Sequence, residues 1–378
     1  MTHLVRIVRS TALLFVIVFG QVGTARAADL VVGQVAPFTG TNSVNGTAVM
    51  QGARLHFDYL NASGGINGRK VRFVTRDDGY KADETVRNAR ELVGQEGALV
   101  LLTTLGTDNN EALLNAKVVG PDGVAMVGPR SGASSLYNAP GIYPTRASYH
   151  EEARAIVRQL ATIGITRIAA VVQGDNFGKD ALAGVEEAMK NHVLDLVAEA
   201  EFERGTEKMD APVAAMLKFN PQAIVLLAVT KPAAAFIKAF RAKGGTSRII
   251  CLSIVDPETV LKEAGPAAAR GLAMTVVVPS PGKKTLPLIK EIQRAAELTG
   301  QRNFRMTLNS IEGYINAKVV AEALRKAGND PSRASVMRAL NGLSAVDVGG
   351  FSARLRIGPT EQRFVDLGVI GPTGALLQ

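Results

Sequence analysis

Short apolar stretches alternate with longer amphipathic stretches along nearly the whole chain from residue 29. The short stretches are rich in Val, Ile, Leu and Ala, which is typical of strands buried on both faces of a parallel sheet. The longer stretches carry apolar residues at helical spacing. In the first part of the chain this pattern predicts strands at 29–36, 70–76, 98–102 and 124–127, and helices at 47–61, 83–93 and 109–117.

The strand–helix order begins again after residue 166. A strand at 167–172 and a helix at 179–191 repeat the layout of residues 29–61. A length too great for one typical core, together with this repeat, predicts an α/β protein with two lobes. Beyond the repeat, the pattern predicts strands at 194–202, 223–229, 248–253 and 271–278, and helices at 211–218, 231–243 and 258–263.

Two extended, proline-containing segments, 142–146 and 279–281, are predicted to connect the lobes. The second segment is followed by predicted helices at 286–298 and 312–327. Strands at 351–357 and 363–370 are predicted to close the chain, on either side of a Gly-Pro turn.

The first 27 residues have the features of a secretory signal. Basic residues precede an apolar core of about ten residues, too short for the ~20 that a membrane span needs. Ala25 and Ala27 are the small residues that signal peptidase requires. We therefore expect cleavage after Ala27 and a periplasmic protein; an uncleaved anchor is the alternative. No cysteine lies at the expected cleavage site after the apolar core, so lipid attachment is not expected there.

Charge and cysteine content narrow the possible partners. The predicted signal contains three arginines and no acid, so its removal lowers the formal net charge from +9 to +6. The basic residues are spread singly or in pairs, which is typical of a solvated surface, and nucleic acid is not an expected partner. The single cysteine, Cys251, excludes an internal disulfide and is expected to be a small buried side chain.

No enzyme motif is complete. The segment 174–179, GDNFGK, resembles a phosphate loop, but it has three residues between its glycines where four are needed, and Asp180 replaces the required Ser or Thr. Ser131 in GPRSG does not match the nucleophile elbow. The four histidines lie singly, without metal-ligand spacing, and solvated or capping roles are expected for them. The sequence therefore favours binding without catalysis, metal or cofactor.

The stretch 99–111, LVLLTTLGTDNNE, is predicted to form a buried strand followed by the N-terminus of a helix. Such a terminus carries free N–H groups and the positive end of the helix dipole, so it favours an anionic group. Asp108 is predicted to cap the helix with Glu111 as its capping-box partner, which leaves the Thr107 hydroxyl free. The alternative is that Thr107 is itself only the cap.

Several segments together resemble the periplasmic leucine/isoleucine/valine-binding proteins, the solute-binding components of ABC importers. The resemblance covers nearly the whole chain after residue 28, and APFTG with GGINGRK is its most specific part. The matching segments, in family order, are APFTG, QGARLHFDYLN, ASGGINGRKVRFVTRDD, GTDNN, GPRSGA, RIAAVVQGDNFGKDAL and NSIEGYINAKVVAEAL.

This resemblance implies a type I periplasmic binding protein, in which two doubly wound parallel-sheet lobes are joined by three crossovers and close over a solute. The implied N-terminal lobe comprises residues 28–145 and 280–350, and the implied C-terminal lobe comprises 146–279 and 351–378. A monomer that delivers its solute to an inner-membrane ABC permease is expected. A ligand-sensing protein for a membrane receptor and an exported α/β enzyme are the alternatives from other functional classes.

The resemblance also implies a ligand site on the loops that follow the strands. The Thr107 hydroxyl and the backbone of residues 130–132 would hold a ligand carboxylate. Arg130 would grip the carboxylate with its guanidinium or, alternatively, point to solvent or tie down its loop. Tyr149 would contact the ligand or pack the hinge. The implied ligand-binding residues are Asn45, Gly106, Thr107, Arg130, Ser131, Gly132, Tyr149, Phe177, Thr230 and Ser253.

Ser253 is the most informative departure from the family pattern. Amino-acid binders commonly place an acidic residue there to pair with the α-ammonium, and a serine cannot neutralise a buried cation. Gly132 also stands where such binders often carry threonine. We therefore expect a small aromatic or aliphatic carboxylate without an α-amino group. A branched-chain amino acid is the alternative if Asp256 or Glu312 supplies the missing anion.

Overall fold

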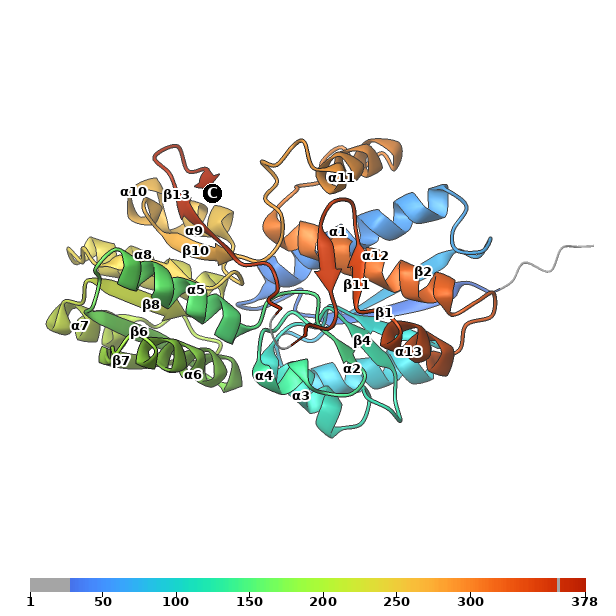
Figure 1. The fold of residues 1–378 in the computed structure, drawn as a ribbon, viewed down its shortest axis with the longest axis horizontal. Coiled ribbons are helices and arrows are strands. Elements are labelled where there is room, and N and C mark those ends of the chain that lie inside the picture. The colour runs from blue at the N-terminus through green and yellow to red at the C-terminus, as the bar shows by residue number, and fades with distance from the viewer. Residues whose placement is uncertain (1–27, 359–360) are drawn as a thin grey trace, which may run out of the picture.

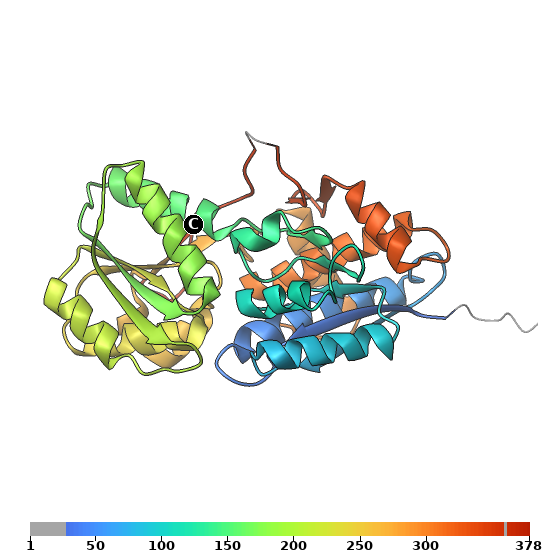
Figure 2. The same ribbon diagram turned by 90° about the horizontal axis from the view of Figure 1, so that it is seen from below.

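The computed structural model describes residues 28–358 and 361–378. The predicted signal, residues 1–27, lies outside them. Two α/β lobes stand side by side (Figure 1, Figure 2), each built around one central sheet. Parallel strands dominate both sheets, so the predicted fold class, two doubly wound lobes, is confirmed.

The N-terminal lobe contains a five-stranded, fully parallel sheet in the order β2-β1-β3-β4-β5. Its strands are β1 (Leu30–Ala36), β2 (Val71–Asp77), β3 (Val100–Leu102), β4 (Ala125–Val127) and β5 (Ile142–Tyr143). The remaining elements of this lobe are α1 (Ser43–Ala62), α2 (Ala82–Gly94), α3 (Thr107–Asn115), α4 (Ser134–Tyr137), α11 (Pro287–Leu298), α12 (Leu308–Lys326), α13 (Arg333–Asn341), β11 (Ala345–Asp347) and β12 (Ser352–Arg354).

The C-terminal lobe contains a seven-stranded sheet in the order β14-β13-β10-β9-β8-β6-β7, in which only β13 and β14 run antiparallel to their neighbours. Its strands are β6 (Ile168–Gly174), β7 (Leu196–Glu203), β8 (Ala223–Leu227), β9 (Arg248–Cys251), β10 (Ala273–Val276), β13 (Asp366–Ile370) and β14 (Leu376–Leu377). Its helices are α5 (Tyr149–Thr162), α6 (Asn176–Lys190), α7 (Asp210–Phe219), α8 (Thr230–Ala242), α9 (Pro257–Ala264) and α10 (Pro266–Ala269).

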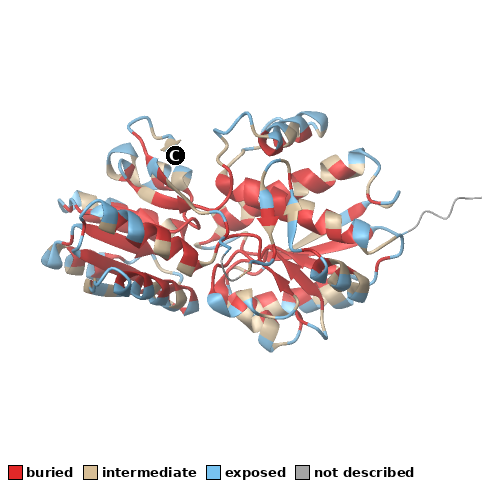
Figure 3. Ribbon diagram, in the orientation of Figure 1, coloured by how far each residue is buried: buried red, intermediate tan, exposed pale blue. Residues whose placement is uncertain are grey.

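Three segments connect the lobes. The chain passes from β5 to α5 through residues 144–148, from β10 to α11 through 277–286, and from β12 to β13 through 355–365. Buried residues fill both sheets and continue across the junction between the lobes (Figure 3). The lobes are therefore packed against each other in this structure.

The helices α1 and α12 cross closely on one face of the N-terminal sheet (Figure 1). A Cβ at Gly52 would lie 1.8 Å from the carbonyl oxygen of Ser310, and one at Gly313 would lie 2.0 Å from that of Val49. Only glycine permits this approach. The crossing places the first turns of α12, which carry Asn309 and Glu312, at the junction with the C-terminal lobe.

His56 departs from the sequence expectation of a solvated or capping histidine. It is buried on α1, with its ring 4.8 Å from the Tyr314 ring in an edge arrangement. Burial, together with the nearby charges of Lys318 and Arg325, lowers the pKa of His56 to about 3. The side chain is therefore a neutral part of the core. Within the described ranges no helix is long and apolar enough to cross a membrane.

Candidate functional site

A small cavity lies where the carboxyl ends of the two sheets face each other, the position at which open α/β sheets bind ligands. Its volume is about 10 Å³, room for roughly one water molecule. Residues of both lobes line it, each from the loop or first helical turn after a strand: Asn42, Asn45, Tyr80, Leu105, Gly106, Thr107, Arg130, Tyr149, Phe177, Val229 and Ile254.

The cavity is small because the lobes are closed over it. Asn45 Nδ2 of α1 donates to the Ile254 carbonyl, 3.0 Å away in the other lobe, and Thr230 Oγ1 lies 3.3 Å from Asn45 Oδ1. Asn309 Nδ2 lies 3.5 Å from Asp256 Oδ2. These contacts join the lobes directly around the cavity. A solute larger than water therefore enters only if the lobes separate.

The N-cap of α3, which follows β3, is not the residue that was predicted. The helix begins at Thr107, and Gly106 is its N-cap with φ +93°, so neither Asp108 nor Thr107 caps it with a side chain. Instead the Thr107 hydroxyl lies 2.8 Å from the Ser131 hydroxyl. Thr103, at the end of β3, has φ +48°, which is unusual for a β-branched residue. Asn316 Nδ2 holds it by donating to its Oγ1 at 3.0 Å.

Arg130 is buried and reaches the cavity from the loop after β4. Its Nη1 donates to the Glu312 carboxylate and its Nη2 to the side-chain oxygen of Asn309, both on α12. Its Nε is buried with no protein hydrogen-bond acceptor. Burial lowers the pKa of Arg130, and Glu312 opposes this effect. The side chain therefore does not point to solvent, and it joins the loop after β4 to α12.

A second buried arginine continues this charge cluster into the hinge. Arg146, on the first connection, donates to Glu152 of α5 at 2.9 Å and lies 3.5 Å from Glu312. Burial disfavours its charge, but Glu312 and Glu152 outweigh that effect and raise the pKa of Arg146. We call Arg130, Arg146, Glu152 and Glu312 the hinge quartet. Its two cations and two anions balance.

Ser253 belongs to the surroundings of the hinge quartet. Its hydroxyl accepts a hydrogen bond from Arg146, and its backbone N–H donates to Glu152 at 2.8 Å. It is buried but does not line the cavity. The serine that stands at the family's acidic position thus lies beside an acid, Glu152, that already pairs with an arginine.

The structure brings six of the ten implied residues to the cavity wall: Asn45, Gly106, Thr107, Arg130, Tyr149 and Phe177. The other four stand behind that wall. Ser131 bonds Thr107, Gly132 accepts the Tyr149 N–H at 2.8 Å, and Thr230 bonds Asn45. Five lining residues, Asn42, Tyr80, Leu105, Val229 and Ile254, were not predicted. Their position just after strand ends was the signal that could have found them.

The cavity wall combines aromatic rings with one charge. Tyr149 and Phe177 pack edge to face with ring centroids 5.1 Å apart, and Tyr80 lies on the opposite lobe. Arg130 is the sole charged side chain among the lining residues. The acids that the amino-acid alternative requires are engaged elsewhere: Glu312 pairs with two arginines, and Asp256 caps α9 by accepting from Thr259.

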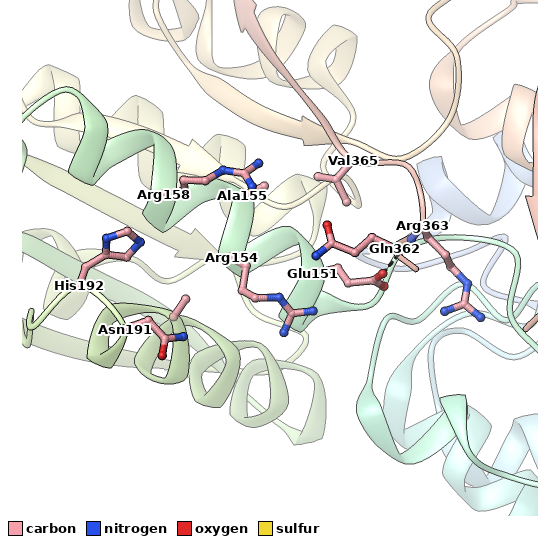
Figure 4. A pocket seen from close by; sticks show the side chains of 10 residues that line it. Glu151, Arg154, Ala155, Arg158, Asn191, His192, Gln362, Arg363 and Val365 are labelled. Atoms are coloured by element: carbon pink, nitrogen blue, oxygen red, sulfur yellow. Dashed lines mark hydrogen bonds between the residues drawn. The ribbon is translucent and has the colours of Figure 1, made fainter. Parts of the chain in front are cut away.

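A larger cavity of about 200 Å³ lies on the outside of the C-terminal lobe, between α5, the end of α6 and the third connection (Figure 4). The carboxylate of Glu151 accepts from the Arg363 backbone there at 2.9 Å, and the Arg363 side chain points away from the cavity. Its lining residues come from α5, the end of α6 and the third connection and not from the carboxyl ends of strands, and none of them is Phe, Tyr or Trp. In the described part of the chain, no group of His, Cys, Asp and Glu is arranged to hold a metal.

Comparisons with known proteins identify the family and agree with the fold. Residues 29–366 match the periplasmic binding protein family. A substrate-binding periplasmic protein from Ralstonia solanacearum has a crystal structure with a TM-score of 0.88 at 41% identity, covering 93% of this chain and all of that one. An extracellular ligand-binding receptor from Verminephrobacter eiseniae has a TM-score of 0.84 at 27% identity, again over 93% of this chain and all of its own. An amino acid binding protein from Pseudomonas aeruginosa is 24% identical over 82% of this chain and 83% of its own.

Proposed function

The chain belongs to the periplasmic binding protein family, and we propose that it binds a small carboxylate without an α-amino group between its two lobes, for delivery to an inner-membrane ABC permease. An aromatic or aliphatic organic acid is the favoured ligand class. The mature protein begins after Ala27, acts in the periplasm as a monomer and catalyses no reaction on its solute.

The observation that carries this proposal is the charge of the cavity wall. Arg130 is its one charged residue, and the Nε of that arginine has no protein acceptor. A ligand carboxylate would supply a charged acceptor for this buried Nε–H. An α-ammonium would find no free carboxylate among the lining residues and would be costly to desolvate.

A bound ligand would favour closure because the residues of the cavity wall are divided between the two lobes. Arg130, Thr107 and Tyr80 come from the N-terminal lobe, and Tyr149 and Phe177 from the C-terminal lobe. A ligand with a carboxylate at the first group and an apolar body against the second contacts both lobes only when they are closed. It therefore shifts the population toward the closed state.

Thermal unfolding with matched ligand pairs tests the proposal. Leucine is compared with 4-methylpentanoate, which is leucine without its amino group, and phenylalanine with 3-phenylpropanoate; benzoate is added as the smallest aromatic acid. A ligand that binds only the folded state stabilises it by about 2.7 kcal/mol at a hundredfold excess over Kd. We expect the amine-free member of each pair to raise the melting temperature more.

An amino acid remains the second candidate, because the Pseudomonas aeruginosa relative is called an amino acid binding protein. A larger shift with leucine than with 4-methylpentanoate would favour it and contradict the argument from Ser253 and Arg130. No shift with any of the five compounds would contradict both candidates.

A further inference from the structure

Arg204 extends from the C-terminal lobe into a set of groups on the N-terminal lobe. It is the first residue after β7. Its Nη2 donates to the Tyr80 carbonyl at 2.9 Å and to Asn109 Oδ1 at 2.7 Å. Its Nη1 lies 3.1 Å from Asp108 Oδ2, and its guanidinium lies over the Tyr80 ring, 4.1 Å from the centroid. One C-terminal-lobe side chain thus contacts three N-terminal-lobe residues.

Tyr80 needs this support because its own backbone is strained. It has φ +67°, a conformation that side-chain-bearing residues rarely adopt. Within its own lobe the Tyr80 N–H donates to Asp78 Oδ1 at 2.9 Å. The ring of Tyr80 lies against Gly106, so it forms the cavity wall next to the start of α3. Arg204 holds both the carbonyl and the ring of this residue from the opposite lobe.

A second ion pair joins the lobes outside the hinge quartet, and it is far more exposed to solvent. Arg305 pairs with Glu258 across the cleft, but their side chains are 76% and 47% exposed. Exposed ion pairs of this kind contribute little. The Arg204 side chain is 21% exposed, and its ring contact and two hydrogen bonds add to the ion pair. Asp175 of its own lobe lies 3.5 Å from its Nε and orients it.

We propose that Arg204 is the positioning residue of the binding cleft: it sets the equilibrium between open and closed lobes and places Tyr80 against the ligand without touching the ligand itself. Opening separates Arg204 from Tyr80, Asp108 and Asn109 at once, because all three lie on the other lobe. The cavity wall formed by Tyr80 is therefore complete only in the closed protein.

This inference rests on the proposed function for its meaning, because a positioning residue presupposes a cleft that binds a solute. Its test is separate, because lobe separation is measured first without any ligand. Gln51 and Lys262 are exposed and lie on opposite walls of a groove of about 460 Å³ at the mouth of the cleft. Nitroxide labels on Gln51→Cys and Lys262→Cys report that separation, and the buried Cys251 is protected from labelling.

The distance distribution between the labels is measured for the otherwise unchanged protein, for R204Q, and for R305Q as the matched control. We expect R204Q to move at least half of the free protein to longer distances, while R305Q leaves the distribution unchanged. Benzoate is then titrated as the probe. R204Q should need at least tenfold more benzoate to restore the short distance, whereas R204K, which keeps the charge but loses the planar fork, should fall between.

The melting temperature of each free variant is measured alongside, because a merely structural role would lower it without changing the label distance. If R204Q does not fold, D108N and N109A remove contacts from the other lobe and should shift the distances in the same direction. Distances and benzoate midpoints equal to those of the unsubstituted protein would overturn the inference. Failure of benzoate to bind the unsubstituted protein would contradict that ligand, while the ligand-free distances would still decide the role of Arg204.

Discussion

The hydroxyl of Thr107 lies 2.8 Å from the hydroxyl of Ser131, so the first residue of α3 is joined to the loop after β4. Ser131 Oγ also accepts the N–H of Ala133 at 3.2 Å. The helix cap is Gly106, and therefore the Thr107 side chain is available for a role other than capping. Two hydroxyls at neighbouring strand ends thus lie together, with Thr107 in the cavity wall and Ser131 behind it.

Thr107→Val removes one of these hydroxyls while keeping the shape of the side chain. We expect the free protein to lose about 1 kcal/mol of stability, the usual worth of one buried hydrogen bond. We expect the amine-free carboxylate that binds best to bind at least tenfold more weakly, as measured by calorimetry. Ser131→Ala is the control, because it leaves the Thr107 hydroxyl in place. Equal affinity for the Thr107→Val variant and the unsubstituted protein would restrict Thr107 to a structural role.

Glu312→Gln leaves the hinge quartet with two arginines and one carboxylate. An uncompensated buried charge of this kind costs about 3–5 kcal/mol, and we expect a loss of that size in urea unfolding. A bound carboxylate would restore the balance at Arg130, so benzoate should stabilise this variant more than it stabilises the unsubstituted protein. Glu258→Gln, which breaks an exposed pair, is expected to cost less than about 1 kcal/mol. If benzoate stabilised Glu312→Gln and Glu258→Gln to the same extent, this result would contradict a carboxylate-binding site at Arg130.

Asp78 is expected to make the folded protein less stable as the pH rises, whereas most carboxyl groups make it more stable. Burial raises its pKa from 3.8 to about 6, against hydrogen bonds from Thr85 and Tyr80 that lower it. The folded protein therefore binds this proton more tightly than the unfolded chain, and the ionised group costs up to about 3 kcal/mol at pH 7.5. That cost disappears as the pH falls from about 6 to 4.

Asp78→Asn removes this titration. Urea unfolding at pH 4, 5, 6 and 7.5 should show the unsubstituted protein gaining stability relative to this variant as the pH falls. Asp347 is the matched opposite case, because backbone N–H groups of Gly349 and Gly350 lower its pKa. The ionised Asp347 carboxylate stabilises the folded protein, and this contribution is lost at low pH. The unsubstituted protein should therefore lose stability relative to Asp347→Asn as the pH falls. A pH-independent difference for Asp78→Asn would contradict the raised pKa.

Gly132 has no room for a side chain. A Cβ there would lie 2.6 Å from both the backbone nitrogen and Cδ1 of Tyr149. We expect Gly132→Ala to cost about 1–3 kcal/mol through overpacking and to weaken ligand binding by displacing Tyr149. Gly94→Ala, at an exposed helical position with no atom near its Cβ, should be neutral or slightly stabilising in the same chemical denaturation. Identical effects of the two substitutions would contradict the close approach to Tyr149.

The alternation of strands and helices was predictable because buried parallel strands are continuous apolar runs. Helix α5 was not predicted, although it carries both Tyr149 and Glu152. Its first turn contains two adjacent acids, which is typical of a solvent-exposed surface. Glu152 is nevertheless fully buried against Arg146. The starts of α3 and α12 also differ from prediction, by two and four residues, because their caps are Gly106 and a Thr307–Ser310 capping box.

The candidate site was predictable only where the residues resembled a family. Arg130 and Arg146 both meet Glu312 over long stretches of chain, and no local pattern signals such pairings. Tyr80 was missed for a related reason. Its place in the wall depends on a left-handed backbone and on Arg204, 124 residues further along the chain.

The antiparallel strand β13 has a consequence for the order of folding. It pairs with β10, and β10 has its other neighbour in β9, so the edge of the C-terminal sheet is covered only by residues 366–370. Between β10 and β13 the chain first returns to the other lobe to build α11, α12 and α13. Neither lobe is therefore a continuous stretch of sequence. During synthesis the β10 edge of the C-terminal sheet stays open and aggregation-prone until residues 366–370 have been added, so this sheet is completed only after α11, α12 and α13 have been made.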